Sequence, residues 1–256
     1  MSERSSFERG AESAGTGRAS VLRSLLFNLL FWIVTSIMAV AVLPALLLPR
    51  RAMQKVARSW MRVVQWLLTV VVGLDYEVRG AERIPRVPAI FALKHQSAWE
   101  TLVCHVLLDD PAIALKRELT QIPLFGWYAR RAGMIRIDRG SGARALRSLV
   151  EGGREALARG SSIVIFPEGT RVRPGERRPY QPGVAALYLQ LGSPVVPVAL
   201  NSGLFWGRRS FVKRPGRIVI EFLPAIAPGL ERRTFMAELE QRLEGATERL
   251  LAEARA

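Results

Sequence analysis

A histidine and a carboxylate five residues apart, in the stretch KHQSAWE from Lys94 to Glu100, are the residues best placed for acid–base chemistry. Histidine occurs only twice in the 256 residues, and His95 is one of the two. A neutral imidazole can accept a proton near pH 7, and a carboxylate on its other ring nitrogen fixes the tautomer and stabilises the imidazolium. The stretch therefore presents His95 as a candidate base and Glu100 as its orienting acid.

The same stretch also fits the start of a helix. An apolar run at residues 89–93 leads into a turn, and a helix is expected from Ala98. Ser97 would then be the N-cap and Glu100 the N3 residue of a capping box. Because a carboxylate at N3 folds back toward the residues that precede the helix, the turn alone permits both interpretations.

A second polar stretch follows another apolar run. IVIFPEGTR, from Ile163 to Arg171, is a strand pattern that stops at Pro167 and turns at Gly169. Strand ends in α/β sheets are where sites are built, and an arginine there suits bidentate binding of a phosphate. The alternative for Arg171 is an ion pair on the surface.

Four ordered stretches together resemble the blocks of the glycerolipid acyltransferases. KHQSAWE resembles the HxxxxD block, and the later blocks are matched by GMIRIDR (Gly133–Arg139), FPEGTR (Phe166–Arg171) and VVPVAL (Val195–Leu200). KRELTQIPLFGW (Lys116–Trp127) fits the segment before the second block. The resemblance runs from Asp75 to Phe222 and is strongest to the bacterial 1-acylglycerol-3-phosphate acyltransferases.

This resemblance implies a direct acyl transfer without a cofactor or metal. The donor would be acyl-CoA or acyl-carrier protein, the acceptor lysophosphatidate and the product phosphatidate, with His95 and Glu100 as catalytic residues. Substrate would be bound by residues of the later blocks, namely Lys116, Arg139, Glu168, Gly169, Thr170 and Arg171. Glu100 stands where the family has aspartate, so its longer side chain must fold differently to reach His95. Backbone amides near His95–Ser97 are candidate donors to the oxyanion of the tetrahedral intermediate.

Two other functions are compatible with the scaffold. The acceptor could be another lysolipid, such as lyso-ornithine lipid, or the protein could bind anionic lipid without catalysis. The presence of both His95 and Arg171 argues against a non-catalytic protein.

Two further patterns have simpler structural interpretations. Cys104 lies in an apolar helical stretch beside His105, which is typical of a small buried hydrophobe rather than a nucleophile. GSGARA (Gly140–Ala145) matches a dinucleotide-binding pattern but more simply opens a helix.

Composition narrows the possible partners. The net charge is +15 and the pI about 11.3, which predicts an anionic partner. The basic residues are spread along the chain without zinc-finger spacing or an RNA-binding aromatic motif, so we expect membrane and phosphate rather than nucleic acid. The single cysteine excludes an internal disulfide and a multi-cysteine metal site.

The N-terminal region predicts a membrane anchor of two helices. No charge occurs from Ser24 to Pro49, a run long enough to cross a bilayer core, which needs roughly 20 residues. The run exceeds the apolar region of a signal peptide and is therefore expected to stay uncleaved. Polar residues then recur three or four apart, as on one stripe of a helix, at Lys55, Arg58, Arg62, Gln65 and Thr69. That helix would lie in the bilayer interface among anionic head groups, or pack on the soluble core.

Beyond residue 74, short apolar runs alternate with helical patterns, which predicts an α/β fold. Strands are expected at 75–79, 89–93, 112–115, 134–137, 162–166, 195–200 and 217–222. Helices are expected at 98–108, 124–132, 143–158, 183–191 and 231–253. We therefore expect a disordered tail (1–20), a two-helix membrane anchor (21–74) and an acyltransferase domain (75–256) with a mixed sheet flanked by helices. The resemblance implies a bacterial inner membrane, with the catalytic domain facing the cytoplasm.

Overall fold

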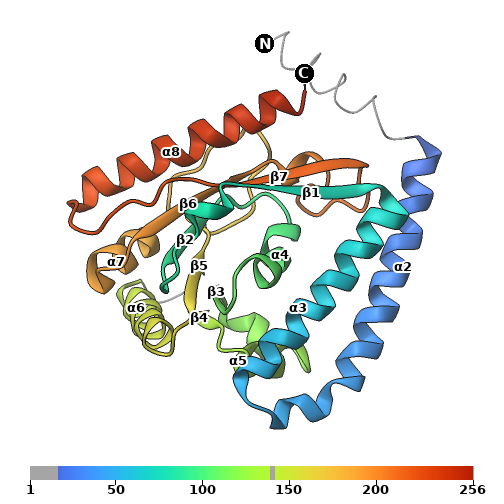
Figure 1. Ribbon diagram of the computed structural model, residues 1–256, viewed down its shortest axis with the longest axis horizontal. Helices are drawn as coiled ribbons and strands as arrows, with labels where there is room; N and C mark the ends of the chain where they lie inside the picture. The colour runs from blue at the N-terminus through green and yellow to red at the C-terminus, as the bar shows by residue number, and fades with distance from the viewer. Residues whose placement is uncertain (1–16, 139–141, 256) are drawn as a thin grey trace.

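A seven-stranded sheet forms the centre of the protein, as seen in a computed structural model that describes residues 17–138 and 142–255 (Figure 1). The strands are β1 (Leu74–Arg79), β2 (Ile90–Leu93), β3 (Pro111–Lys116), β4 (Ile135–Ile137), β5 (Ser162–Ile165), β6 (Val195–Leu200) and β7 (Gly216–Phe222). Their order is β1-β7-β6-β2-β5-β3-β4, and neighbours are parallel except β6 and β7. The expected mixed α/β sheet is confirmed.

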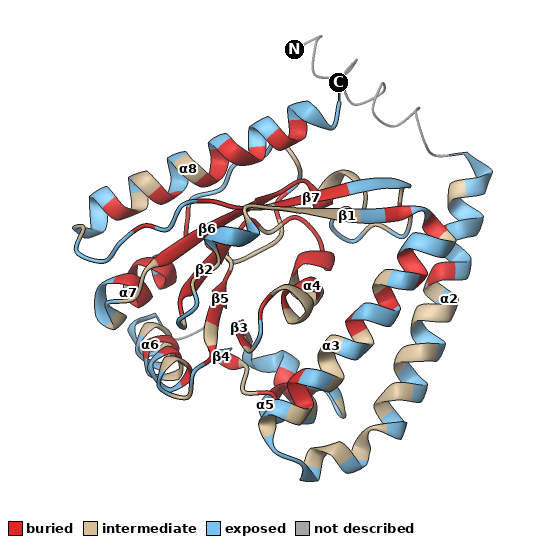
Figure 2. Cartoon of the chain, in the orientation of Figure 1, coloured by how far each residue is buried: buried red, intermediate tan, exposed pale blue. Residues whose placement is uncertain are grey.

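Helices cover both faces of this sheet (Figures 1 and 2). They are α3 (Arg50–Leu67), α4 (Trp99–Leu107), α5 (Phe125–Arg131), α6 (Ala143–Ala158), α7 (Pro182–Leu191) and α8 (Arg232–Glu253). Successive side chains of a strand point to opposite faces. In β2, Ile90 and Ala92 join the core beneath α6, α7 and α8, whereas Phe91 and Leu93 join the core beneath α3 and α4.

The uncharged N-terminal run is not one helix. Helix α2 (Arg18–Ala41) begins inside the stretch expected as a tail, and a 3-10 turn, η1 (Leu43–Leu47), follows it, with Pro44 near its start. Proline lacks an amide hydrogen and clashes with a continuing helix, which explains the break. In the part of the chain that the structure describes, α2 is the one helix long and apolar enough to cross a membrane, with a mean hydropathy of 2.1.

Helix α3 returns from η1 and packs against the sheet's helical layer, and its expected polar stripe is divided. Lys55 and Arg62 are exposed. Arg58 instead donates to the backbone oxygens of His105 at 2.9 Å and Leu108 at 3.1 Å. These oxygens lie at the C-terminal end of α4, where carbonyl groups lack helical partners and attract cations. The expectation that the whole stripe faces lipid head groups is therefore wrong for Arg58.

One apolar core joins the helical hairpin to the sheet. Phe27 of α2 and Val64 of α3 are buried in the same cluster as Phe91, Trp99 and Ile218. A short π-helical turn, η2 (Leu68–Val72), adds two further buried residues before β1 begins. Residue 74 thus marks the change from helix to strand, while the packing continues across it.

Candidate active site

The candidate site lies where β2 and β5 end side by side. Both strands are parallel, so the turn at His95 and the FPEGTR loop emerge at the same edge of the sheet. The backbone amide of Val172 donates to the carbonyl oxygen of His95 at 2.7 Å. The ring of Phe166 stacks on the imidazole of His95, with centroids 4.0 Å apart. Two blocks far apart in the sequence therefore hold one histidine.

The imidazole of His95 is in direct contact with Glu100. His95 Nδ1 lies 2.9 Å from Glu100 Oε1, and the Glu100 side chain is fully buried, whereas that of His95 is 14 % exposed. The longer glutamate side chain, which stands where the family has aspartate, thus spans the distance. The other ring nitrogen, Nε2, remains as the candidate proton acceptor.

The hydrogen bonds of the expected capping box form in the same place, although α4 begins at Trp99 and its N-cap residue is Ala98 rather than Ser97. The amides of Gln96 and Ser97 donate to Glu100 Oε1 at 2.7 and 2.6 Å, and the amide of Trp99 donates to Ser97 Oγ at 3.1 Å. The carboxylate of Glu100 therefore accepts the hydrogen bonds at the start of the helix and also contacts the histidine. Because Glu100 already occupies the amides of Gln96 and Ser97, the expectation that these two amides stabilise an oxyanion is wrong.

The second oxygen of Glu100 is held by a residue that the sequence did not single out. Ser202 Oγ donates to Glu100 Oε2 at 2.8 Å, and Ser202 is fully buried. It begins a short turn, η5 (Ser202–Leu204), just after β6, the neighbour of β2. The amide of Gly203 in this turn also donates to Gln96 Oε1 at 3.1 Å. The only sequence signal was that the VVPVAL block ends two residues earlier.

Glu168 takes part in a buried ion-pair cluster. Its carboxylate is fully buried and lies 2.9 Å from Lys94 Nζ, which also lies 2.6 Å from Glu244 of α8. Tyr180 donates a further hydrogen bond of 2.7 Å to Glu244. Burial raises the pKa of Glu168, while the Lys94 ammonium opposes the rise. The group ties the end of β2 to the FPEGTR loop and α8, and the expected contact of Glu168 with substrate stays a prediction.

Arg171 differs from most arginines of the described chain. Its Nε is buried and has no hydrogen-bond partner among the described residues. Gly169 supports this turn, since its φ is +65° and a Cβ would come within 2.9 Å of the Gln181 side chain. Thr170, between them, is partly buried. The turn thus carries an incompletely bonded guanidinium, and the next residue, Val172, bonds to the backbone of His95.

The two other expected phosphate ligands are Lys116 and Arg139. Lys116 is exposed at the end of β3, and β5 lies between β3 and β2. Arg139 lies outside the described residues, as do the first two residues of the GSGARA stretch, Gly140 and Ser141.

Cys104 and His105 make structural contacts, and the Cys104 thiol donates to the backbone carbonyl oxygen of Glu100 at 3.0 Å. Cys104 is 2 % exposed, which agrees with its interpretation as a buried hydrophobe, and burial raises the pKa of its thiol. His105 Nδ1 lies 3.1 Å from Gln54 Oε1. Burial, and next the charge of Arg58, lower the pKa of His105 to about 4. His105 is therefore a structural link between α3 and α4.

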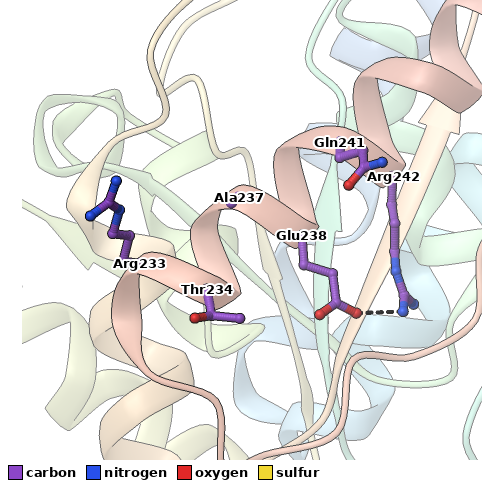
Figure 3. A pocket seen from close by; sticks show the side chains of 6 residues that line it. All are labelled: Arg233, Thr234, Ala237, Glu238, Gln241 and Arg242. Atoms are coloured by element: carbon purple, nitrogen blue, oxygen red, sulfur yellow. Dashed lines mark ion pairs between the residues drawn. The ribbon is translucent and has the colours of Figure 1, made fainter.

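A surface depression on α8 is separate from this site. Figure 3 shows it lined by Arg233, Thr234, Ala237, Glu238, Gln241 and Arg242, with an ion pair between Glu238 and Arg242. None of the residues expected to act in catalysis or acceptor binding lines it.

Comparison with known proteins agrees with this geometry, and the fold and site define an acyltransferase. Residues 75–201 match the protein family described as Acyltransferase. The chain is 39 % identical over 208 residues to the 1-acyl-sn-glycerol-3-phosphate acyltransferase of Pseudomonas aeruginosa, covering 81 % of each chain. The chain belongs to the 1-acyl-sn-glycerol-3-phosphate acyltransferase family.

The chain is also similar to an acyltransferase named for another lysolipid and to a solved structure. The chain is 34 % identical over 137 residues to the lyso-ornithine lipid O-acyltransferase of Pseudomonas aeruginosa, covering 53 % of this chain and 52 % of that one. The fold matches the crystal structure of the 1-acyl-sn-glycerophosphate acyltransferase PlsC from Thermotoga maritima with a TM-score of 0.77 at 23 % identity. That match covers 91 % of this chain and 98 % of the other, and it agrees with the expected architecture.

Proposed function

We propose that this protein transfers a fatty acyl group from a thioester donor to the free hydroxyl of 1-acylglycerol-3-phosphate, producing phosphatidate. The observation that carries the proposal is the His95–Glu100 pair at the edge of the sheet, beside the incompletely bonded Arg171. A lysophosphatidate offers a hydroxyl for the former and a phosphate for the latter.

In this mechanism, His95 acts as the general base. Nδ1 carries the proton that faces Glu100, so Nε2 presents a lone pair to the acceptor hydroxyl. As Nε2 takes the proton, the hydroxyl oxygen attacks the thioester carbonyl carbon and forms a tetrahedral oxyanion. Its collapse breaks the carbon–sulfur bond, and the departing thiolate takes the proton from the imidazolium. Ser202 and the capping amides keep the carboxylate of Glu100 aligned with Nδ1 throughout.

Arg171 is proposed to bind the acceptor phosphate. A guanidinium offers planar, paired donors that match phosphate oxygens, and one of its nitrogens is buried without a partner among the described residues. The hydrogen bond from Val172 to the His95 carbonyl places this loop against the base. Binding of the phosphate would therefore position the hydroxyl near His95.

The test compares acceptors in the full-length enzyme with a labelled acyl donor. Arg171→Ala is expected to lower kcat/KM for lysophosphatidate at least about tenfold, since a hydrogen bond to a charged group is worth about 1.5–3 kcal/mol. Use of an uncharged monoacylglycerol should change little, and Arg171→Lys should recover only part of the loss. Arg177→Ala is the control, because Arg177 is exposed and pairs with Glu248. An equal loss for charged and uncharged acceptors would move the phosphate site elsewhere.

We also propose that the protein is bound to the bacterial inner membrane through α2, with the catalytic domain on the cytoplasmic side. Helix α2 exposes large apolar side chains, among them Leu22 (64 %), Trp32 (65 %) and Ile37 (62 %). Its other side is fixed to the domain, since Lys213 Nζ donates to Asn28 Oδ1 at 2.6 Å. A helix held along its side in this way would lie with its apolar face in one leaflet.

Sedimentation tests this attachment. Salt near 1 M screens charges beyond about 3 Å but leaves apolar burial intact. The full-length protein should therefore stay in the membrane pellet at that salt concentration and require detergent for release. Release by salt alone would show that surface charge, and not apolar burial, attaches the protein to the membrane.

A further inference from the structure

A compact segment after β3 exposes four large apolar side chains. This apolar protrusion, residues 117–131, consists of the 3-10 turn η4 (Arg117–Gln121) and helix α5. The exposed side chains are Leu119 (39 %), Ile122 (47 %), Phe125 (48 %) and Trp127 (46 %). In Figure 1 the protrusion lies beside the lower end of α3, next to the turn that joins it to α2.

The apolar protrusion is tightly built rather than loose. Leu124 has a φ of +63°, and the amide of Phe125 donates to the carbonyl of Pro123 at 2.7 Å. Gly126 lies so close to Thr120 that a Cβ would come within 2.0 Å of its carbonyl oxygen. Arg130 donates to the same carbonyl oxygen at 3.1 Å. Backbone strain of this kind persists only where the surrounding structure fixes it, so the apolar side chains are held outward.

The apolar protrusion is joined to the end of the α2–α3 hairpin. The hydroxyl of Tyr128 donates to the carbonyl oxygen of Ala39, and Arg131 donates to that of Leu48. The adjoining turn η1 exposes Leu47 (87 %), and Leu48, the residue after it, is 49 % exposed. One apolar surface therefore continues from α2 through η1 onto the apolar protrusion.

The charges around this surface match a lipid leaflet. Arg130 and Arg131 are exposed at its border, and Trp127 lies within it. Tryptophan and arginine gather at membrane interfaces, where ring and stem meet the acyl chains and the charge meets anionic head groups. We propose that the apolar protrusion inserts into the same leaflet as α2, as a second and separate lipid contact. The inference rests on the proposed membrane attachment.

This contact would also set the height of Lys116 relative to the bilayer. Lys116, a candidate phosphate ligand, directly precedes the apolar protrusion. Insertion of the apolar protrusion would hold Lys116 at the level of the lipid phosphates, so that lysophosphatidate could reach the site without leaving the bilayer.

Site-specific labelling tests the proposal in the full-length protein. The single native cysteine, Cys104, is 2 % exposed, so a cysteine placed at the surface can be labelled selectively. Phe125→Cys and Leu189→Cys form a matched pair, because both native side chains are 48 % exposed and Leu189 lies on α7. Each would carry a polarity-sensitive fluorophore and be mixed with phosphatidylcholine–phosphatidylglycerol vesicles that contain nitroxide-labelled acyl chains.

We expect a blue shift and several-fold stronger nitroxide quenching at position 125 than at position 189. Equal quenching at both positions would overturn the proposal, because it would indicate adsorption without orientation. Absence of quenching at 125 in protein that sediments with vesicles would also overturn it, while leaving membrane attachment and acyl transfer standing. If the protein does not sediment with vesicles, the proposed membrane attachment and the proposed insertion of the apolar protrusion are both wrong. Ile122→Cys, at a side chain 47 % exposed, repeats the measurement should Phe125→Cys fail to fold.

Discussion

Two fully buried carboxylates near His95, those of Glu100 and Glu168, have different surroundings. Glu100 meets the imidazole, two backbone amides and the Ser202 hydroxyl, all between 2.6 and 2.9 Å. Glu168 meets the Lys94 ammonium, which Glu244 shares. Both glutamates stand in blocks that resemble the family, so the sequence assigned both to the site.

The carboxylates of Glu100 and Glu168 are equally buried, but they differ in the hydrogen-bond donors that surround them. Four donors from different directions fix the plane of the Glu100 carboxylate and point one oxygen at Nδ1. A single shared ammonium leaves Glu168 with a raised pKa because desolvation is the larger effect. We infer that Glu100 orients the base, whereas Glu168 connects structural elements.

The sharpest test of this contrast replaces each acid by its amide. Glu100→Gln is expected to lower kcat by about 10²–10⁴-fold, because the amide loses the charge and can favour the wrong tautomer of His95. Glutamine is nearly as good at N3 of a capping box, so folding should be retained. Glu168→Gln should retain activity within about tenfold, since it removes no contact with the imidazole. Equal kcat losses in the two folded variants would contradict the different roles inferred for Glu100 and Glu168.

Removing the shared ammonium should affect stability more than chemistry. Lys94→Met leaves Glu168 and Glu244 buried together without a counter-charge, and breaking a buried pair in this way costs about 3–5 kcal/mol. The free energy of unfolding, measured with denaturant in detergent, should fall by that amount. Adding Glu168→Gln to Lys94→Met should restore part of it. An unchanged free energy of unfolding in Lys94→Met would show that the cluster contributes little.

The hydroxyl of Ser202 provides a finer test of the donors around Glu100. Ser202→Ala leaves Glu100 Oε2 buried without this donor, which costs about 1–3 kcal/mol and lowers kcat about tenfold or more. The acceptor KM should stay constant, because Ser202 orients the acid rather than the substrate. Ser202→Thr should recover activity. Ser210→Ala serves as the control, since the Ser210 hydroxyl donates to the carbonyl oxygen of the nearby Val212 at 2.7 Å. A rise in KM at unchanged kcat would contradict the positioning role.

His105, the histidine outside the candidate site, provides a test that depends on pH. His105 has a folded pKa of about 4, against about 6.5 when unfolded, so the unfolded chain binds the proton first as pH falls. Its stabilising contribution is complete above about pH 6.5 and declines by about 1.4 kcal/mol per pH unit down to about pH 4. His105→Gln should flatten the slope of Tm between these pH values relative to the native protein. Equal slopes of Tm against pH in the two proteins would show that His105 is not the source of this pH dependence.

Local patterns in the sequence were sufficient for the elements and for the histidine pair. All seven strands were expected within one residue of their bounds, because each is a short apolar run between turn residues. The reach of Glu100 to His95 follows from the short turn that leads from β2 into α4. Ser202, by contrast, lies 102 residues from Glu100, and Arg58 turns inward to the end of a helix some fifty residues later. Such contacts depend on the three-dimensional packing of distant segments, which periodicity does not encode.

The apolar core that α2 and α3 share with the sheet also constrains the order in which the protein can be made. The hairpin leaves the ribosome before the sheet, but its buried residues Phe27 and Val64 belong to the same core cluster as Ile218 of β7, which is synthesised last among the described strands. Under the proposed membrane attachment, the bilayer would shelter the apolar side chains of the hairpin during that interval, and insertion would precede completion of the fold. Ribosome-bound chains that end before β7 should thus be membrane-associated yet protease-sensitive, and chains that extend beyond it should become protected.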